Sequence, residues 1–78
     1  MRVIIRDSKG TTQGFQIEGN DYVRDLIGKI KSTNKIDKDI RLLYGGELLE
    51  EDELISSYEI SNENHITYIG PFLGGIFN

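Results

Sequence analysis

The sequence predicts an α+β fold in which one helix packs on one face of a mixed sheet of four or five strands. Short segments with a two-residue hydrophobic period flank a single segment with a helical period. Residues that favour turns separate these segments. A helix with one apolar stripe and a sheet with one apolar face bury these surfaces by packing together. The 78 residues leave room for one such domain.

The first two strands are predicted to form a hairpin. Residues 1–6 alternate between apolar and mostly charged side chains, and residues 12–18 place Phe15 and Ile17 on one face. Between them, residues 7–10 have the sequence Asp-Ser-Lys-Gly, which is typical of a turn. The short connection makes the two strands antiparallel neighbours.

A helix is predicted to follow, with Asp21 as its N-cap. Four apolar residues then fall at i, i+3, i+4 and i+7, the spacing of one helical stripe: Val23, Leu26, Ile27 and Ile30. Residues 32–34, Ser-Thr-Asn, compete for backbone hydrogen bonds and end the helix.

A second hairpin is predicted from residues 40–44 and residues 47–49, joined by a tight turn at Gly45 and Gly46. Residues 50–53 are all acidic, and we expect them to form a solvated loop.

The last elements are one helical turn over residues 54–58 and a closing strand over residues 65–69. Pro71 cannot donate to a sheet ladder and ends that strand. We therefore divide the chain into a domain, residues 1–70, and a glycine-rich flexible tail, residues 71–78. Four large apolar side chains in this tail indicate either a partner's groove or packing back on the domain: Phe72, Leu73, Ile76 and Phe77.

The charge of the chain argues against nucleic acid as a partner. The chain has 13 acidic and 9 basic residues, and no run of Lys or Arg could neutralise phosphates. No segment approaches the ~20 apolar residues needed to cross a membrane. The amino terminus returns to charge too soon for a signal peptide. We expect a monomer located in the cytoplasm or the nucleus.

Enzyme chemistry has little support in the sequence. There is no Cys, and His65 is the single histidine, so neither a Cys/His metal site nor a Cys–His catalytic pair can form. The acidic run lacks the ligand spacing of a calcium loop. We predict no catalytic residue, no metal and no cofactor.

Several short strings lie in matching order and at matching positions to those of a known family: Lys29-Ile30, Asp39, Arg41-Leu42, Gly46, Leu49-Glu50 and Tyr58-x-Ile60. With these strings the chain resembles ubiquitin and its relatives over nearly all of residues 1–75. The resemblance implies a β-grasp fold, in which the hydroxyl of Tyr58 anchors the preceding loop.

The resemblance also implies a function for the tail. In conjugated members a terminal Gly-Gly is activated, passed to enzymes as a thioester and joined to target lysines. Gly75 would then be the attachment residue, with Gly74 beside it. A protease would cut between Gly75 and Ile76 and remove the three-residue extension Ile76-Phe77-Asn78. The implied partners are activating and conjugating enzymes, this processing protease and target proteins.

The chain departs from ubiquitin at places that matter for this function. Pro71 and Leu73 stand where ubiquitin has Arg residues, which implies a different activating enzyme or none. Glu47 and Asn62 replace lysines that form chains, and Lys29 matches a minor chain-forming lysine. The partner-binding surface implied by the family is half polar here: Ser8, Leu43, Thr67 and Ile69, to which we add Phe72. The chain is therefore a divergent relative and not ubiquitin itself.

Two other functions remain open. The chain could be a non-covalent ubiquitin-like adaptor, in which Gly74-Gly75 is incidental and the apolar tail packs on the domain or on a partner. It could also be a β-grasp sulfur carrier, although such carriers generally end at the Gly-Gly pair.

Overall fold

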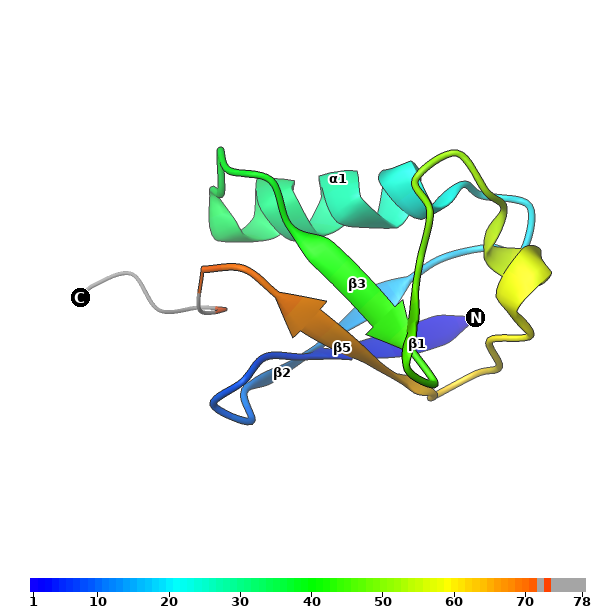
Figure 1. The fold of residues 1–78 in the computed structure, drawn as a ribbon, viewed down its shortest axis with the longest axis horizontal. Helices are drawn as coiled ribbons and strands as arrows, with labels where there is room; N and C mark the ends of the chain where they lie inside the picture. The colour runs from blue at the N-terminus through cyan, green and yellow to red at the C-terminus, as the bar shows by residue number, and fades with distance from the viewer. Residues whose placement is uncertain (72, 74–78) are drawn as a thin grey trace.

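The computed structural model describes residues 1–71 and residue 73, and one helix lies across a five-stranded mixed sheet (Figure 1). The elements in chain order are β1 (Arg2–Arg6), β2 (Thr12–Gln16), α1 (Val23–Asn34), β3 (Arg41–Tyr44), β4 (Glu47–Leu48), the 3-10 turn η1 (Ile55–Tyr58) and β5 (His65–Ile69). The strand order is β2-β1-β5-β3-β4. The central pair, β1 and β5, is parallel, and the other neighbours are antiparallel. The predicted fold class is confirmed.

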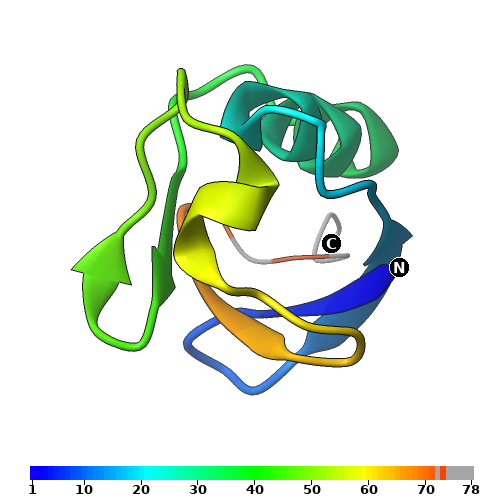
Figure 2. The same cartoon turned by 90° about the vertical axis from the view of Figure 1, so that its right-hand side faces the viewer.

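The hydrophobic core lies between the sheet and α1, and Figure 2 shows the sheet curling beneath the helix. All four residues of the predicted helical stripe are buried in it. The sheet supplies the inward-facing residues of its strands, among them Val3, Ile5, Leu42, Ile66 and Tyr68. Each strand face is set by the two-residue period, so the sequence pattern and the burial agree.

The start of α1 differs from the prediction. The N-cap is Tyr22, one residue after Asp21. The carboxylate of Asp21 accepts a hydrogen bond from the backbone N–H of Glu18 at 2.8 Å, so it closes the preceding turn instead. The N–H of Tyr22 donates to Oδ2 of Asp25 at 2.8 Å, which ties the N-cap to the first helical turn. The predicted end at Asn34 is confirmed, and Lys35 adopts the left-handed conformation beyond it.

The second hairpin has the predicted turn. Gly45 and Gly46 have φ values of 60° and 82°, a conformation that glycine adopts without steric penalty. Leu43 pairs with Leu48 across this turn. The loop that follows is anchored as the resemblance implied, because the N–H of Glu50 donates to the Tyr58 hydroxyl at 2.8 Å.

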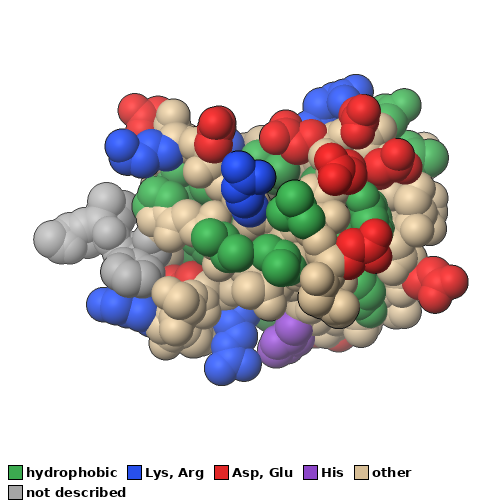
Figure 3. All heavy atoms as spheres, viewed as in Figure 1, with side chains coloured by type: hydrophobic (Ala, Val, Ile, Leu, Met, Phe, Trp, Pro, Cys, Tyr) green, Lys and Arg blue, Asp and Glu red, His purple; other side chains and the backbone are tan. Residues whose placement is uncertain are grey.

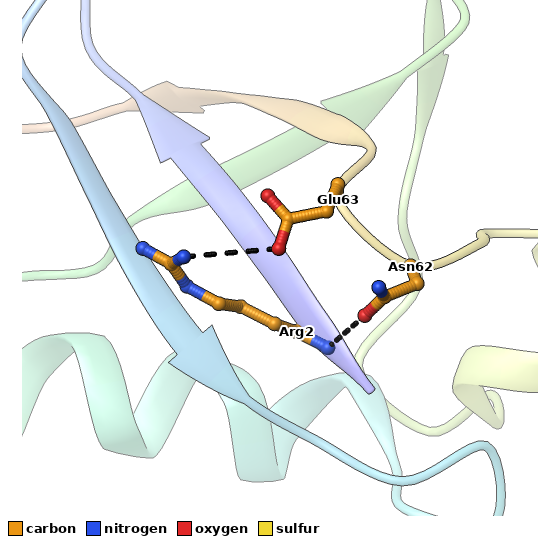
Figure 4. A network of polar contacts seen from close by, with 3 residues as sticks. All are labelled: Arg2, Asn62 and Glu63. Atoms are coloured by element: carbon orange, nitrogen blue, oxygen red, sulfur yellow. Dashed lines mark hydrogen bonds and ion pairs between the residues drawn. The ribbon is translucent and has the colours of Figure 1, made fainter.

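A polar network fixes the start of β1 against the loop that precedes β5 (Figure 4). The N–H of Arg2 donates to Oδ1 of Asn62 at 2.7 Å, and the N–H of Glu63 donates to the Arg2 carbonyl at 2.7 Å. The Arg2 guanidinium also lies 3.7 Å from the Glu63 carboxylate. This ion pair is exposed and adds little stability. The two backbone-donated bonds hold β1 in register beside β5.

Candidate functional site

The outer face of the sheet carries the surface implied by the family resemblance. Leu43 and Thr67 are cross-strand partners, and Ile69 lies opposite Arg41 on the same pair of strands. Ile69 is 51% exposed and Thr67 is exposed, whereas Leu43 is half-buried. Ser8 is exposed in the turn between β1 and β2. Phe72 lies outside the described residues.

Leu48 joins this face, although the sequence did not single it out as a surface residue. It is 40% exposed, and its pairing with Leu43 places both side chains on one side of the sheet. Cross-strand pairing extends this row of neighbouring side chains from Leu43 to Thr67 and then to Arg6. Apolar side chains therefore occupy only one end of the row. Figure 3 shows a small group of hydrophobic side chains on one side of the molecule, with acidic side chains gathered towards one end.

A groove lies on another part of the molecule, between β2 and α1. It has a volume of about 880 Å³. Its lining comes from one strand and one helix: Gln13, Gly14, Phe15, Gln16, Asp25, Gly28, Lys29, Ser32 and Thr33. Apart from its two chain neighbours and the backbone of the helix itself, no atom lies within 4 Å of the position where a Cβ on Gly28 would stand, so this glycine leaves open space on the helix. The possible acceptor lysine, Lys29, is exposed and belongs to this lining.

An amide pair links the two sides of the groove. The side chains of Gln13 on β2 and Asn34 at the end of α1 exchange two hydrogen bonds, each 2.9 Å long. Asn34 is buried, and it also donates to the Ile30 carbonyl at 2.9 Å. These bonds hold the carboxyl end of the helix at a fixed distance from the edge strand.

Beyond β5 the described chain packs back on the domain. Leu73 is only 3% exposed and belongs to the core, although the sequence assigns it to the tail. Its N–H donates to Oδ2 of Asp7 at 3.0 Å. The other oxygen of Asp7, Oδ1, accepts the N–H groups of Lys9 and Thr11 at 3.0 and 2.9 Å. The Asp7 carboxylate is thus buried, at 5% exposure, and accepts three backbone hydrogen bonds.

Tyr68 and Gly70 shape the return of the chain. The Tyr68 hydroxyl donates to the Pro71 carbonyl at 2.6 Å. Burial, and secondarily the negative charge of Asp7, raise the pKa of Tyr68 above 10.0. A Cβ on Gly70 would lie 2.7 Å from the Tyr68 hydroxyl oxygen and 2.8 Å from Cγ2 of Ile40, so the close turn requires glycine.

The structure thus favours, for Leu73, one of the two expectations for the apolar tail residues: it packs on the domain. Gly74, Gly75 and Ile76 lie outside the described residues. Conjugation through Gly75 and cleavage before Ile76 therefore remain predictions.

Sequence reasoning missed Asp7, which it took only as a turn former. The signal was present, because Asp7 follows Val3 and Ile5 in the same two-residue period and so faces the core. A carboxylate on a buried face needs hydrogen-bond donors, and backbone N–H groups of the turn and of Leu73 supply them here.

A family model described as Ubiquitin-2 like Rad60 SUMO-like matches residues 1–68. The chain belongs to this SUMO-like family. As a SUMO-like domain it has the β-grasp fold that the resemblance implied, with one helix held on a five-stranded mixed sheet. The match covers the β2–α1 groove and the outer sheet face except Ile69, and it ends before Pro71 and Leu73.

Ubiquitin-like domains are generally non-enzymatic. Within residues 1–71 and 73 of this SUMO-like domain, no group of three or more acidic or histidine side chains could hold a metal ion. Over the same part of the chain, no helix is long and apolar enough to span a bilayer.

Proposed function

We propose that this SUMO-like domain is a non-covalent protein-binding module that accepts an extended segment of a partner in the groove between β2 and α1. The observation that supports the proposal is the position of β2. It is an edge strand, paired on one side with β1, and the groove runs beside it. An edge strand binds an extended peptide through backbone hydrogen bonds, and the adjacent groove takes the peptide's side chains.

The lining defines the kind of segment that fits. Apart from Phe15 and the two glycines its side chains are polar, and its two charged groups, Asp25 and Lys29, have opposite signs. A strongly acidic or strongly basic segment would gain little from this pair. The proposed ligand is therefore a neutral, polar segment with one apolar side chain directed at Phe15 and the open space beside Gly28. About five residues would match the length of β2.

Filling the groove tests this function. Peptides are selected from a random library on the full chain, and their affinities are measured for the wild type and for Gly28→Leu. The added side chain meets open space, so the fold should tolerate it while the groove is obstructed. Binding should weaken at least tenfold.

Arg24→Leu is the matched control, because Arg24 is exposed on the same helix but does not line the groove. Its affinity should stay within about twofold of the wild type. Selected peptides that bind Gly28→Leu as well as the wild type would show that the groove is not the binding site.

Covalent modification is the second candidate, and the Gly74-Gly75 pair directly after Leu73 favours it. In this function a protease removes Ile76-Phe77-Asn78, and activating and conjugating enzymes then attach Gly75 to target lysines. Lys29 is a candidate acceptor for chains. Both candidates involve a monomer in the cytoplasm or the nucleus with protein partners, and neither involves nucleic acid, a membrane or a cofactor.

Tagged full-length protein in lysate from its native cell tests the second candidate. High-mass adducts should form and should be lost in Gly75→Ala. Intact-mass measurement of the endogenous protein gives the complementary result. Retention of the three-residue extension, together with an absence of adducts, would exclude covalent modification and favour the binding module.

A further inference from the structure

We propose that Arg2 selects an acidic side chain on the segment that pairs with β2, at the residue of that segment opposite Gly14. The proposal rests on the binding function given above, and it concerns the other side of the added strand. Alternate residues of a strand point to opposite faces of the sheet, so only half of the segment's side chains enter the groove. The other half lie on the outer face, where different residues set the charge preference.

The open edge of β2 is formed by the backbone groups of alternate residues. The amino group of Met1 donates to the Ile17 carbonyl and the N–H of Ile17 donates to the Met1 carbonyl, each at 2.9 Å. Such bonds recur at every second residue of an antiparallel pair, so the odd-numbered residues of β2 bond to β1. The remaining residues point their N–H and carbonyl groups to the edge on which, within residues 1–71 and 73, no strand pairs: Thr12, Gly14 and Gln16.

The Arg2 side chain extends from β1 across β2 (Figure 4). Its guanidinium carbon Cζ lies 2.7 Å from the position where a Cβ on Gly14 would stand, and its Nε and Nη2 are also next to that position. A glycine weakens the interior of a strand and often marks a place where another group approaches closely. Here Gly14 makes room for a cation on the outer face of β2, beside the open edge.

The guanidinium can bind a carboxylate in this position. Its Nη1 lies 3.7 Å from the Glu63 carboxylate, in an exposed pair that contributes little, and the Arg2 side chain is 53% exposed. Nε and Nη2 share a different edge of the guanidinium, and two N–H groups on one edge can donate to a single carboxylate. The three residues of the open edge are uncharged, so their side chains neither repel nor neutralise an incoming acid.

The geometry of a paired strand fixes where the acid lies in the segment. A residue directly opposite Gly14 points to the side of the guanidinium, with a Cβ about 4.5–5.5 Å from the Cβ position on Gly14. Its neighbours in sequence point to the helix side, one of them beside Phe15 in the groove. The acidic residue is therefore next in sequence to the apolar residue that enters the groove. The neutral character of the ligand applies to the side chains inside the groove.

Substitutions beside the apolar residue of a bound peptide test this contact. A library-selected peptide that Gly28→Leu weakens is chosen, and each residue flanking its apolar side chain is replaced in turn by Glu and by Gln. At one of these positions Glu should bind the wild type about three- to fivefold more tightly than Gln, the range of an exposed ion pair. In Arg2→Gln this preference should disappear. Affinity for the Gln peptide should stay within about twofold, because the backbone bond from residue 2 to Asn62 remains.

Arg6→Gln is the matched control, since it removes the same charge from the same strand. Arg6 pairs with Thr12, and its Nη2 lies 3.8 Å from the Cβ position on Gly10 in the turn. The preference for Glu should persist in this variant. Its loss in both variants would reveal a general attraction of the basic residues and would overturn the role of Arg2.

Two further outcomes separate this proposal from the function on which it rests. Equal affinity of the wild type for the Glu and Gln peptides at both positions, or a preference that survives in Arg2→Gln, would overturn the role of Arg2 and leave the groove as the binding site. Selected peptides that bind Gly28→Leu as well as the wild type would contradict the groove itself.

Discussion

Single side chains of this domain connect segments that are far apart in the sequence, and Asp7 is the clearest case. Its carboxylate joins the β1–β2 turn to Leu73, 66 residues later. The Tyr58 hydroxyl has a similar role, holding the loop at Glu50. The role of Tyr58 followed from a family resemblance. That of Asp7 could not, because its partner lies in a segment where this chain departs from ubiquitin.

The ionisation of Tyr68 tests the environment of a single side chain. Its pKa is raised by burial and by the charge of Asp7. Below pH 10.0 the phenol is protonated in both the folded and the unfolded chain, and its contribution to stability is fully present. As the pH rises further, the unfolded chain loses this proton first, so the free energy of unfolding falls.

Absorbance of tyrosinate measures this ionisation. The difference between the wild-type titration and that of Tyr68→Phe isolates the one phenol, and its midpoint should lie above pH 10.0. A midpoint at or below this value would mean that Tyr68 is not buried beside Asp7.

The elements of the fold follow from local patterns to different degrees. The buried face of α1 follows from the spacing of Val23, Leu26, Ile27 and Ile30, because a helix fixes which residues share a side. The N-cap does not follow, because the preceding turn engages Asp21 and no local rule decides between two acceptors in adjacent turns. The β2–α1 groove was not foreseen, since it depends on how the helix lies beside the edge strand.

Replacement by alanine should have opposite effects on the free energy of unfolding at two of the glycines. Gly28 lies within α1 with open space around its missing Cβ, so Gly28→Ala should raise the free energy of unfolding by about 0.5–1 kcal/mol. Gly46 has a φ of 82° in the hairpin turn, so Gly46→Ala should lower it by about 1–2 kcal/mol. Urea unfolding of the two variants measures both changes. Equal effects would contradict the helix position of one glycine or the turn conformation of the other.

At the scale of the whole molecule, the domain is closed by the chain that follows its last strand. The order of strands β2-β1-β5-β3-β4 was not predicted from any sequence pattern, because sheet order depends on contacts between distant segments. The burial of Leu73 in the core differs from the sequence prediction, which assigned this residue to the tail. Its glycine-rich surroundings in the sequence are typical of a mobile end.

Truncation of the Leu73 side chain measures how much the chain after β5 contributes to the stability of the domain. Leu73→Ala should lower the free energy of unfolding by about 2–3 kcal/mol, because it leaves a cavity at a buried site. Ile69→Ala removes a side chain that is 51% exposed and should change stability much less. If urea unfolding gives the same small change for both variants, then Leu73 does not belong to the core in solution.

The most direct test of the account is a map of amide chemical shifts in the full chain as a library-selected peptide is added. If the groove is the binding site, the largest changes fall on the residues that line it, which are residues 13–16 of β2 and residues 25, 28, 29, 32 and 33 of α1. Changes centred on Leu43, Thr67 and Ile69, with the groove undisturbed, would contradict it and place binding on the outer face of the sheet.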